Sequence, residues 1–187
     1  MKSVAVFCGA NFGNNPVYKV KAQELGKLLA EQNIQLVFGG GRVGLMGAIA
    51  DSVLTHDGKV VGVIPQSLVD REVAHQSLTE LHVVQTMHER KALMASLADG
   101  FIAMPGGFGT LDEVCEIITW NQLGIITKPV AFYNVNNYFE KFMQLIDGGV
   151  AEGFIRKEYQ TNLIVQEEPE KLLQQLNAAA SMVSKFL

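Results

Sequence analysis

Short apolar runs alternate with longer amphipathic segments along the chain. Runs rich in Val, Ile and Phe at residues 3–8, 34–38 and 59–64 have the composition of buried strands. Apolar residues recur at helical spacing in the segments that follow, 16–32 and 45–54. This alternation predicts a parallel sheet covered by helices on both faces, which is a doubly wound α/β domain. No repeat or linker interrupts it, so residues 1–187 are expected to form a single domain.

The second half of the chain continues the pattern after one irregular stretch. Residues 66–80 mix polar and apolar positions, which predicts an extended loop with one short helical turn. In such a fold, ligands bind at the carboxyl ends of the strands. Further strands are predicted at 81–85, 100–104, 129–133 and 163–165, and further helices at 87–97, 111–123, 138–146 and 169–186.

Composition excludes several classes of protein. The chain is 48% hydrophobic and carries a net charge of −4, which argues against a general nucleic-acid or anionic-membrane surface. No apolar run has the length of a membrane span and the N-terminus lacks a secretory apolar core, so a cytoplasmic protein is expected. Cys8 and Cys115 form no scaffold and are both expected to be small buried hydrophobes. The histidines show no metal-ligand spacing, so we expect no metal site.

Residues 105–113, Pro-Gly-Gly-Phe-Gly-Thr-Leu-Asp-Glu, carry the clearest functional pattern. They join the predicted strand 100–104 to the predicted helix 111–123. Three glycines leave the backbone bare, so its N–H groups and the positive end of the helix can converge on an anion. Thr110 is expected to cap the helix, and Glu113 to lie one turn further on. The pattern predicts a phosphate-binding turn beside a carboxylate.

The spacing of Thr110 and Glu113 has a structural alternative. It is also that of a capping box, in which Glu113 only binds the N–H group of the N-cap residue. A cap requires none of the preceding glycines, whereas close approach to a phosphate does. Phosphate binding is therefore the leading interpretation.

A second glycine-rich turn lies at residues 39–44, Gly-Gly-Gly-Arg-Val-Gly. It matches G-x-G-x-x-G, but it follows the second predicted strand, and no acidic residue follows the next strand to bind a ribose 2′-hydroxyl. A dinucleotide site is therefore the weaker interpretation. The stronger one is a turn that helps to shape a nucleotide or phosphate pocket.

Arg90 and Lys91 are adjacent in the first turn of the predicted helix 87–97. Two cations there oppose the helix dipole. An anionic ligand gripped by Arg90 would explain them, and a solvated basic face is the alternative.

Together these motifs resemble the LONELY GUY family of cytokinin riboside 5′-monophosphate phosphoribohydrolases, long labelled possible lysine decarboxylases. The resemblance implies a Rossmann-like fold, a homodimer, and hydrolysis of a nucleoside 5′-monophosphate to free base and ribose 5-phosphate, with no cofactor. It covers residues 4–155 in order and spacing. The matching pieces are 38–41 (Phe-Gly-Gly-Gly), 44–47 (Gly-Leu-Met-Gly), 71–72 (Arg-Glu), 87–91 (Met-His-Glu-Arg-Lys), 105–113, and 119–124 (Thr-Trp-Asn-Gln-Leu-Gly).

The resemblance also assigns roles to individual residues. Arg90 and Glu113 correspond to the family's catalytic pair. The chain departs from the common pattern at Ala10 and Asn11, where many members have Ser-Ser, and at Asp112, where Glu is common. The residues at the family's substrate-binding positions are Glu72, Arg90, Lys91, Gly107, Phe108, Gly109, Thr110, Leu111, Asp112, Glu113 and Thr119.

On this hypothesis a carboxylate near C1′ stabilises positive charge on the ribose and orients the attacking water. Two other functions remain open. A nucleotide-binding module would bind AMP without turnover. A pyridoxal-phosphate decarboxylase would need a Schiff-base lysine in a larger fold, and Lys91 lies instead among anion-binding features. The apolar segment 117–126 is either a subunit interface or a helix that covers the sheet.

Overall fold

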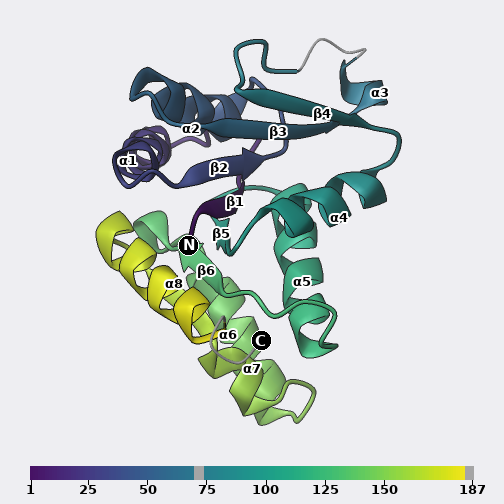
Figure 1. Cartoon of the computed structure of the whole chain (residues 1–187). Coiled ribbons are helices and arrows are strands. Elements are labelled where there is room, and N and C mark those ends of the chain that lie inside the picture. Colours follow the sequence, from purple (N-terminus) through teal and green to yellow (C-terminus); the bar gives the residue numbers. More distant parts are fainter. Residues whose placement is uncertain (70–73, 184–187) are drawn as a thin grey trace.

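The computed structural model describes residues 1–69 and 74–183, which contain one seven-stranded sheet (Figure 1). Every neighbouring pair of strands is parallel, in the order β4-β3-β2-β1-β5-β6-β7. The predicted doubly wound α/β fold is confirmed. The strands are β1 (Ser3–Phe7), β2 (Gln35–Phe38), β3 (Val60–Pro65), β4 (Glu80–Val84), β5 (Phe101–Ala103), β6 (Val130–Tyr133) and β7 (Leu163–Gln166).

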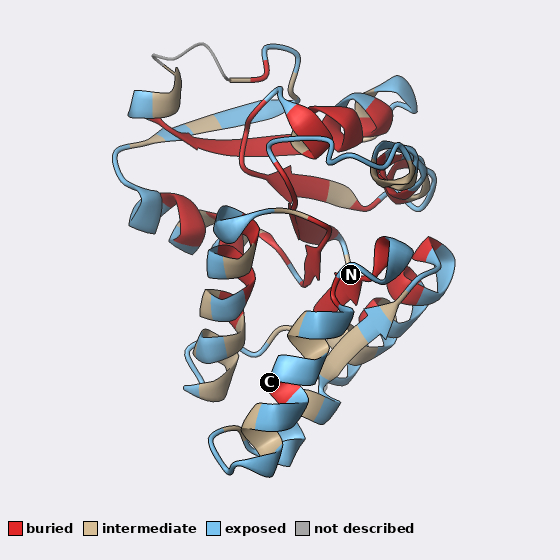
Figure 2. Cartoon of the chain, turned by 180° about the vertical axis from the view of Figure 1, so that it is seen from behind, coloured by how far each residue is buried: buried red, intermediate tan, exposed pale blue. Residues whose placement is uncertain are grey.

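Helices pack on both faces of this sheet and bury two apolar layers. The first layer lies under α1 (Val17–Glu31), α2 (Gly44–Thr55) and α8 (Pro169–Val183). The second lies under α4 (Met87–Leu97), α5 (Phe108–Gln122) and α6 (Glu140–Ala151). Figure 2 shows the central strands buried and the outer helix surfaces exposed. Shorter helices are α3 (Gln66–Val69), α7 (Lys157–Thr161) and the 3-10 turn η1 (Val135–Asn137).

The predicted helices end in slightly different places. The helix expected at 138–146 begins at Glu140 and continues to Ala151 through Gly148 and Gly149. Two glycines disfavour a helix, but a Cβ at Gly149 would lie 2.7 Å from the Ile155 side chain. Packing of the following turn therefore requires a glycine there. The short helix α7 was not predicted.

The loops that follow β1, β2 and β5 meet at the centre of the carboxyl edge. After β4 the chain crosses back to place β5 beside β1, so strand order reverses between these two strands. The N–H group of Gly9 donates to the carbonyl of Pro105, and the carbonyl of Gly9 accepts from Leu45. These bonds hold both glycine-rich turns against the loop after β1.

Candidate active site

Helix α5 begins at Phe108, three residues earlier than expected. Its N-cap is Gly107, and no side chain caps it. The expectation that Thr110 caps the helix is therefore wrong, because extended backbone at Gly107 already allows the helix to begin. Thr110 lies inside the first turn, 3% exposed. A capping box centred on Thr110 is excluded, and the first N–H groups of α5 have no side-chain cap.

The three glycines of this turn differ in whether packing within the chain leaves room for a side chain. A Cβ added at Gly107 or Gly109 would meet nothing within 4 Å, and neither residue has a positive φ. A Cβ at Gly106, by contrast, would overlap the Thr110 hydroxyl and lie 2.8 Å from the nitrogen of Gly9. Internal packing explains Gly106 alone. The open space beside Gly107 and Gly109 leaves room for a ligand to approach the bare backbone.

Arg90 and Glu113 meet across the contact between α4 and α5. Nη1 of Arg90 lies 3.1 Å from Oε1 of Glu113, and each side chain is only 10% exposed. The Nε group of Arg90 donates to the carbonyl of Val63 at 3.1 Å, at the end of β3. Thr86 caps α4 by accepting from Glu89 and so fixes the first turn that carries Arg90. The sequence-predicted catalytic pair is thus assembled, and a solvated basic face is excluded for Arg90.

Burial shifts the titration of this site. The pKa of Glu113 is raised above its ordinary value, chiefly by loss of water around the carboxylate, while the charge of Arg90 opposes the shift. Burial, with the nearby charge of Glu113, also raises the pKa of the Cys8 thiol, so Cys8 stays protonated. Cys8 is buried as expected. Cys115 is exposed, contrary to expectation, because it lies on the solvent side of α5.

Lys91 has partners of its own. Its Nζ lies 3.0 Å from Glu116 and 3.2 Å from Asp112, both on α5. Burial alone would lower the pKa of Lys91, but hydrogen bonds to Glu116 and Asp112 raise it above its ordinary value. These pairs hold α4 against α5. A substrate role for Lys91 stays a prediction.

Another predicted site residue, Thr119, lies apart from this cluster. Thr119 is exposed, and its hydroxyl donates to the carbonyl of Cys115. It follows Thr110 by nine residues, about 13 Å along the helix. Glu72, with Arg71, lies outside the described residues. Leu111 is half-buried in the first turn of α5, beside Asp112.

A cavity of about 210 Å³ adjoins the turn on the side of β1. Tyr138 stands at this cavity, and its hydroxyl donates to the carbonyl of Gly106. Neither Tyr138 nor the Val63 carbonyl was anticipated from sequence. Tyr138 belongs to a segment whose pattern indicated only a helix, and a carbonyl has no residue signature. The lining residues are Gly9, Ala10, Asn11, Phe12, Gly13, Tyr18, Leu45, Pro105, Gly106, Gly107 and Tyr138.

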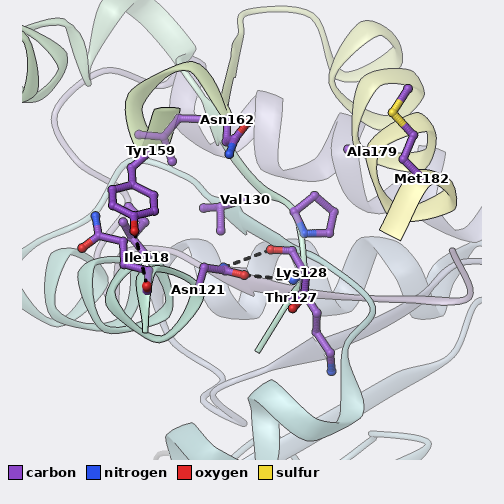
Figure 3. Close-up of a pocket in the computed structure, with 12 residues that line it drawn as sticks. Ile118, Asn121, Thr127, Lys128, Val130, Tyr159, Asn162, Ala179 and Met182 are labelled. Atoms are coloured by element: carbon purple, nitrogen blue, oxygen red, sulfur yellow. Dashed lines mark hydrogen bonds between the residues drawn. The ribbon is translucent and has the colours of Figure 1, made fainter. Parts of the chain in front are cut away.

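A separate pocket of about 350 Å³ lies at the other end of α5, between this helix, α7 and α8 (Figure 3). Asn121 forms part of its wall and exchanges hydrogen bonds with the backbone of Lys128, which closes the turn before β6. No predicted site residue lines it. Its wall begins at Ile118, five residues beyond Glu113 and about 7.5 Å along the helix.

The apolar segment 117–126 is buried in part and exposed in part. Ile117 is buried, and Ile118 and Trp120 pack beside it against the sheet. Leu123 and Ile125, however, are 69% and 62% exposed.

In the described ranges, no group of three or more His, Cys, Asp or Glu could hold a metal ion. Within the same ranges, no helix is long and apolar enough to cross a bilayer.

The sequence matches a family model and several named proteins. The family model described as "Possible lysine decarboxylase" matches residues 46–176. A Rhodococcoides fascians protein named cytokinin riboside 5′-monophosphate phosphoribohydrolase is 47% identical over 170 residues, covering 90% of this chain and 86% of the relative. Arabidopsis thaliana LOG2, of the same name, is 46% identical over 177 residues, covering 94% and 82%.

Solved structures share the fold at much lower identity. The molybdenum cofactor binding protein from Rippkaea orientalis superposes with a TM-score of 0.71 at 21% identity, covering 94% of this chain and 95% of that one. The Moco carrier protein from Chlamydomonas reinhardtii gives 0.72 at 19%, covering 96% and 98%. Similarity at this level establishes the architecture alone.

Proposed function

This chain belongs to the LONELY GUY family of phosphoribohydrolases, and we propose from that premise that it hydrolyses the N-glycosidic bond of adenosine 5′-monophosphates, with or without an N6 substituent. The products are the free base and ribose 5-phosphate. One observation carries the proposal: the uncapped, glycine-lined start of α5 lies one turn from a buried carboxylate paired with Arg90.

The 5′-phosphate binds at the start of α5. The N–H groups of residues 107–110 and the positive end of the helix meet its charge. Open space beside Gly107 and Gly109 lets the phosphate oxygens come within hydrogen-bonding distance of the backbone. Within the described residues, no partner accepts from the buried Thr110 hydroxyl, so this group is available to a phosphate oxygen.

The ribose lies between this turn and Glu113. Loss of the base develops positive charge on the sugar, which the Glu113 carboxylate stabilises. The same carboxylate orients the attacking water and accepts its proton, a role favoured by a pKa above the ordinary value. Arg90 fixes this carboxylate and contacts the ribose or phosphate. Lys91 supports Arg90 from the next position, and Asp112 anchors Lys91.

Glu72 and Phe108 are assigned to the base end of the site. We propose that Glu72 binds the base or a ribose hydroxyl. Phe108 is 92% exposed between the two open glycines, and we propose that it covers the bound nucleotide, with Leu111 behind it.

Chromatographic measurement of base release tests the function. Purified protein is given isopentenyladenosine 5′-monophosphate, AMP or adenosine, beside Glu113→Gln. Release from the monophosphates but not from adenosine, lost in the variant, supports a phosphoribohydrolase. Binding of both monophosphates without release would replace the proposal with a nucleotide-binding module. The ratio of the two rates gives the preferred base.

We further propose a homodimer in the cytoplasm. The exposed Leu123 and Ile125 supply an apolar surface at the end of α5, where a second copy would cover them. Thr119, on the exposed side of α5, would then face the partner. Both cysteines are free, as in a reducing compartment. Light scattering tests the dimer: a monomeric mass, or a dimer unaffected by Leu123→Asp with Ile125→Asp, contradicts it.

A further inference from the structure

We propose that Gly39 is a positioning residue, whose missing side chain provides the space in which the Arg90 guanidinium is held against Glu113. This inference rests on the proposed function for its kinetic consequences, and on geometry alone for the placement of Arg90. It gives a role to the first glycine of residues 39–44, which the phosphate turn at α5 does not explain.

The space is defined by the position that a Cβ would take. A Cβ on Gly39 would lie 2.9 Å from Cζ of Arg90 and would overlap its Nη2 nitrogen. Contacts under 3.0 Å are essentially not tolerated by real Cβ atoms. The group that would be displaced is the guanidinium itself, since the next neighbour, Sδ of Met46, is 3.4 Å away.

The backbone of Gly39 does not itself require glycine. Its neighbour Gly40 has a φ of +72°, which favours glycine whatever surrounds it, whereas Gly39 has no positive φ. Gly39 is also buried at the end of β2. The steric demand of Arg90 therefore explains the glycine at this position.

The guanidinium cannot move aside without losing partners. Its Nε group donates to the carbonyl of Val63, and its Nη1 group is paired with Glu113. Those two contacts and Gly39 hold the planar group from three sides, β3, α5 and the end of β2. Displacement by even about 1 Å in a catalytic constellation can cost on the order of 100-fold in rate.

The test is a double-mutant cycle of Gly39→Ala and Arg90→Lys. The lysine side chain lacks the planar group that fills the space, so G39A should cost little in the R90K background. In the native background, we expect G39A to lower kcat on the order of 100-fold with a much smaller change in KM. Equal losses in both backgrounds would overturn the proposal, because a general structural defect does not depend on residue 90.

A second readout is independent of hydrolysis. NMR titration of the Glu113 carboxyl carbon should show its pKa shifted upward in G39A, since a displaced guanidinium opposes less strongly the shift that burial causes. An unchanged titration in G39A would overturn the proposal. If the native protein releases no base, the proposed function fails and this titration still decides the position of Arg90.

Gly26→Ala provides the matched control. Its Cβ would lie 2.7 Å from the carbonyl oxygen of Ile49, a clash with backbone at the contact of α1 with α2. We expect lower stability with the Glu113 titration unchanged. If G39A does not fold, folding of the G39A/R90K double variant supports the proposal, and failure of both to fold overturns it.

Discussion

Arg90 and Glu113 form a 3.1 Å ion pair although they lie on different helices, and each side chain keeps only 10% of its exposure. The pair closes the gap between α4 and α5 beside the glycine turn. A buried pair of this kind is costly to break, because the remaining charge has no water to replace its partner. A substitution that tests either residue must therefore keep the size and shape of its side chain.

Glu113→Gln keeps the size and hydrogen-bonding shape of the side chain but removes its charge. We expect turnover to fall about 100-fold or more, because stabilisation of the positive ribose is lost. KM for AMP should change little, since the backbone of α5 binds the phosphate. Steady-state kinetics measure both constants, and circular dichroism checks the fold. Near-native turnover would remove Glu113 from the chemistry.

The raised pKa of Glu113 predicts the pH dependence. The carboxylate is active when deprotonated, so activity is lost as pH falls through the folded-state pKa. The acid limb of kcat/KM should therefore lie above 4.5, the ordinary value for Glu. A limb at or below 4.5 would contradict the assignment.

The same shift predicts a change in stability. The folded state holds the proton more tightly than the unfolded chain, so the contribution of Glu113 to stability is largest below pH 4.5 and declines as pH rises through the folded-state pKa. Denaturant unfolding of the native protein and Glu113→Gln across this window measures the difference. A difference that grows in favour of the native protein with rising pH would have the wrong sign.

Gly109→Ala should separate stability from binding. Gly109 lies in the first turn of α5 with open space around it, so alanine should stabilise the helix by about 0.5 kcal/mol. The added methyl group stands in the phosphate space, and we expect KM for AMP to rise about tenfold, the equivalent of one lost hydrogen bond to a charged group. Thermal unfolding and kinetics measure the two effects.

Gly148→Ala is the control for that experiment. Gly148 lies in α6, also with nothing within 4 Å of an added Cβ. It should gain similar stability without any change in KM. If Gly109→Ala leaves KM unchanged as well, the phosphate does not bind against this turn.

Lys91→Met tests the contact between the helices. The substitution keeps the apolar length of the side chain but removes the pairs with Asp112 and Glu116. We expect a loss of about 2 kcal/mol in the free energy of unfolding, typical of lost hydrogen bonds between charged groups. Urea unfolding measures it. A change within experimental error would mean that water replaces Lys91 at both carboxylates.

The sequence predicted the sheet well because its central strands, β1, β2, β3, β5 and β6, are buried and leave continuous apolar runs. It failed at the start of α5, since Phe108, Gly109 and Thr110 carry no helical pattern and only the backbone at Gly107 reveals the start. Arg90 and Glu113 were selected by their motifs, and the structure brings them together, while their catalytic role stays a prediction. Their pairing could not be read from spacing, because it depends on how α4 and α5 pack.

Other contacts had no sequence signal at all. Val63 acts through its carbonyl, which every residue possesses. The buried state of Lys91 was also hidden, since two adjacent cations are as typical of a solvated surface. Its carboxylate partners, Asp112 and Glu116, lie on α5, which follows α4 and β5 in the chain. Such charges become interpretable only when the facing element is known.

The place of β1 in the sheet has a consequence for folding during synthesis. Ala5 pairs on one side with Val37 but on the other with Phe101, so one edge of the first strand has no partner until β5 has left the ribosome. Pairing over such a separation is slow, because a long loop must close first. Strands β1 to β4 therefore keep an unpaired edge at β1 until β5 is synthesised. The helix that follows β5 is α5, which carries Glu113.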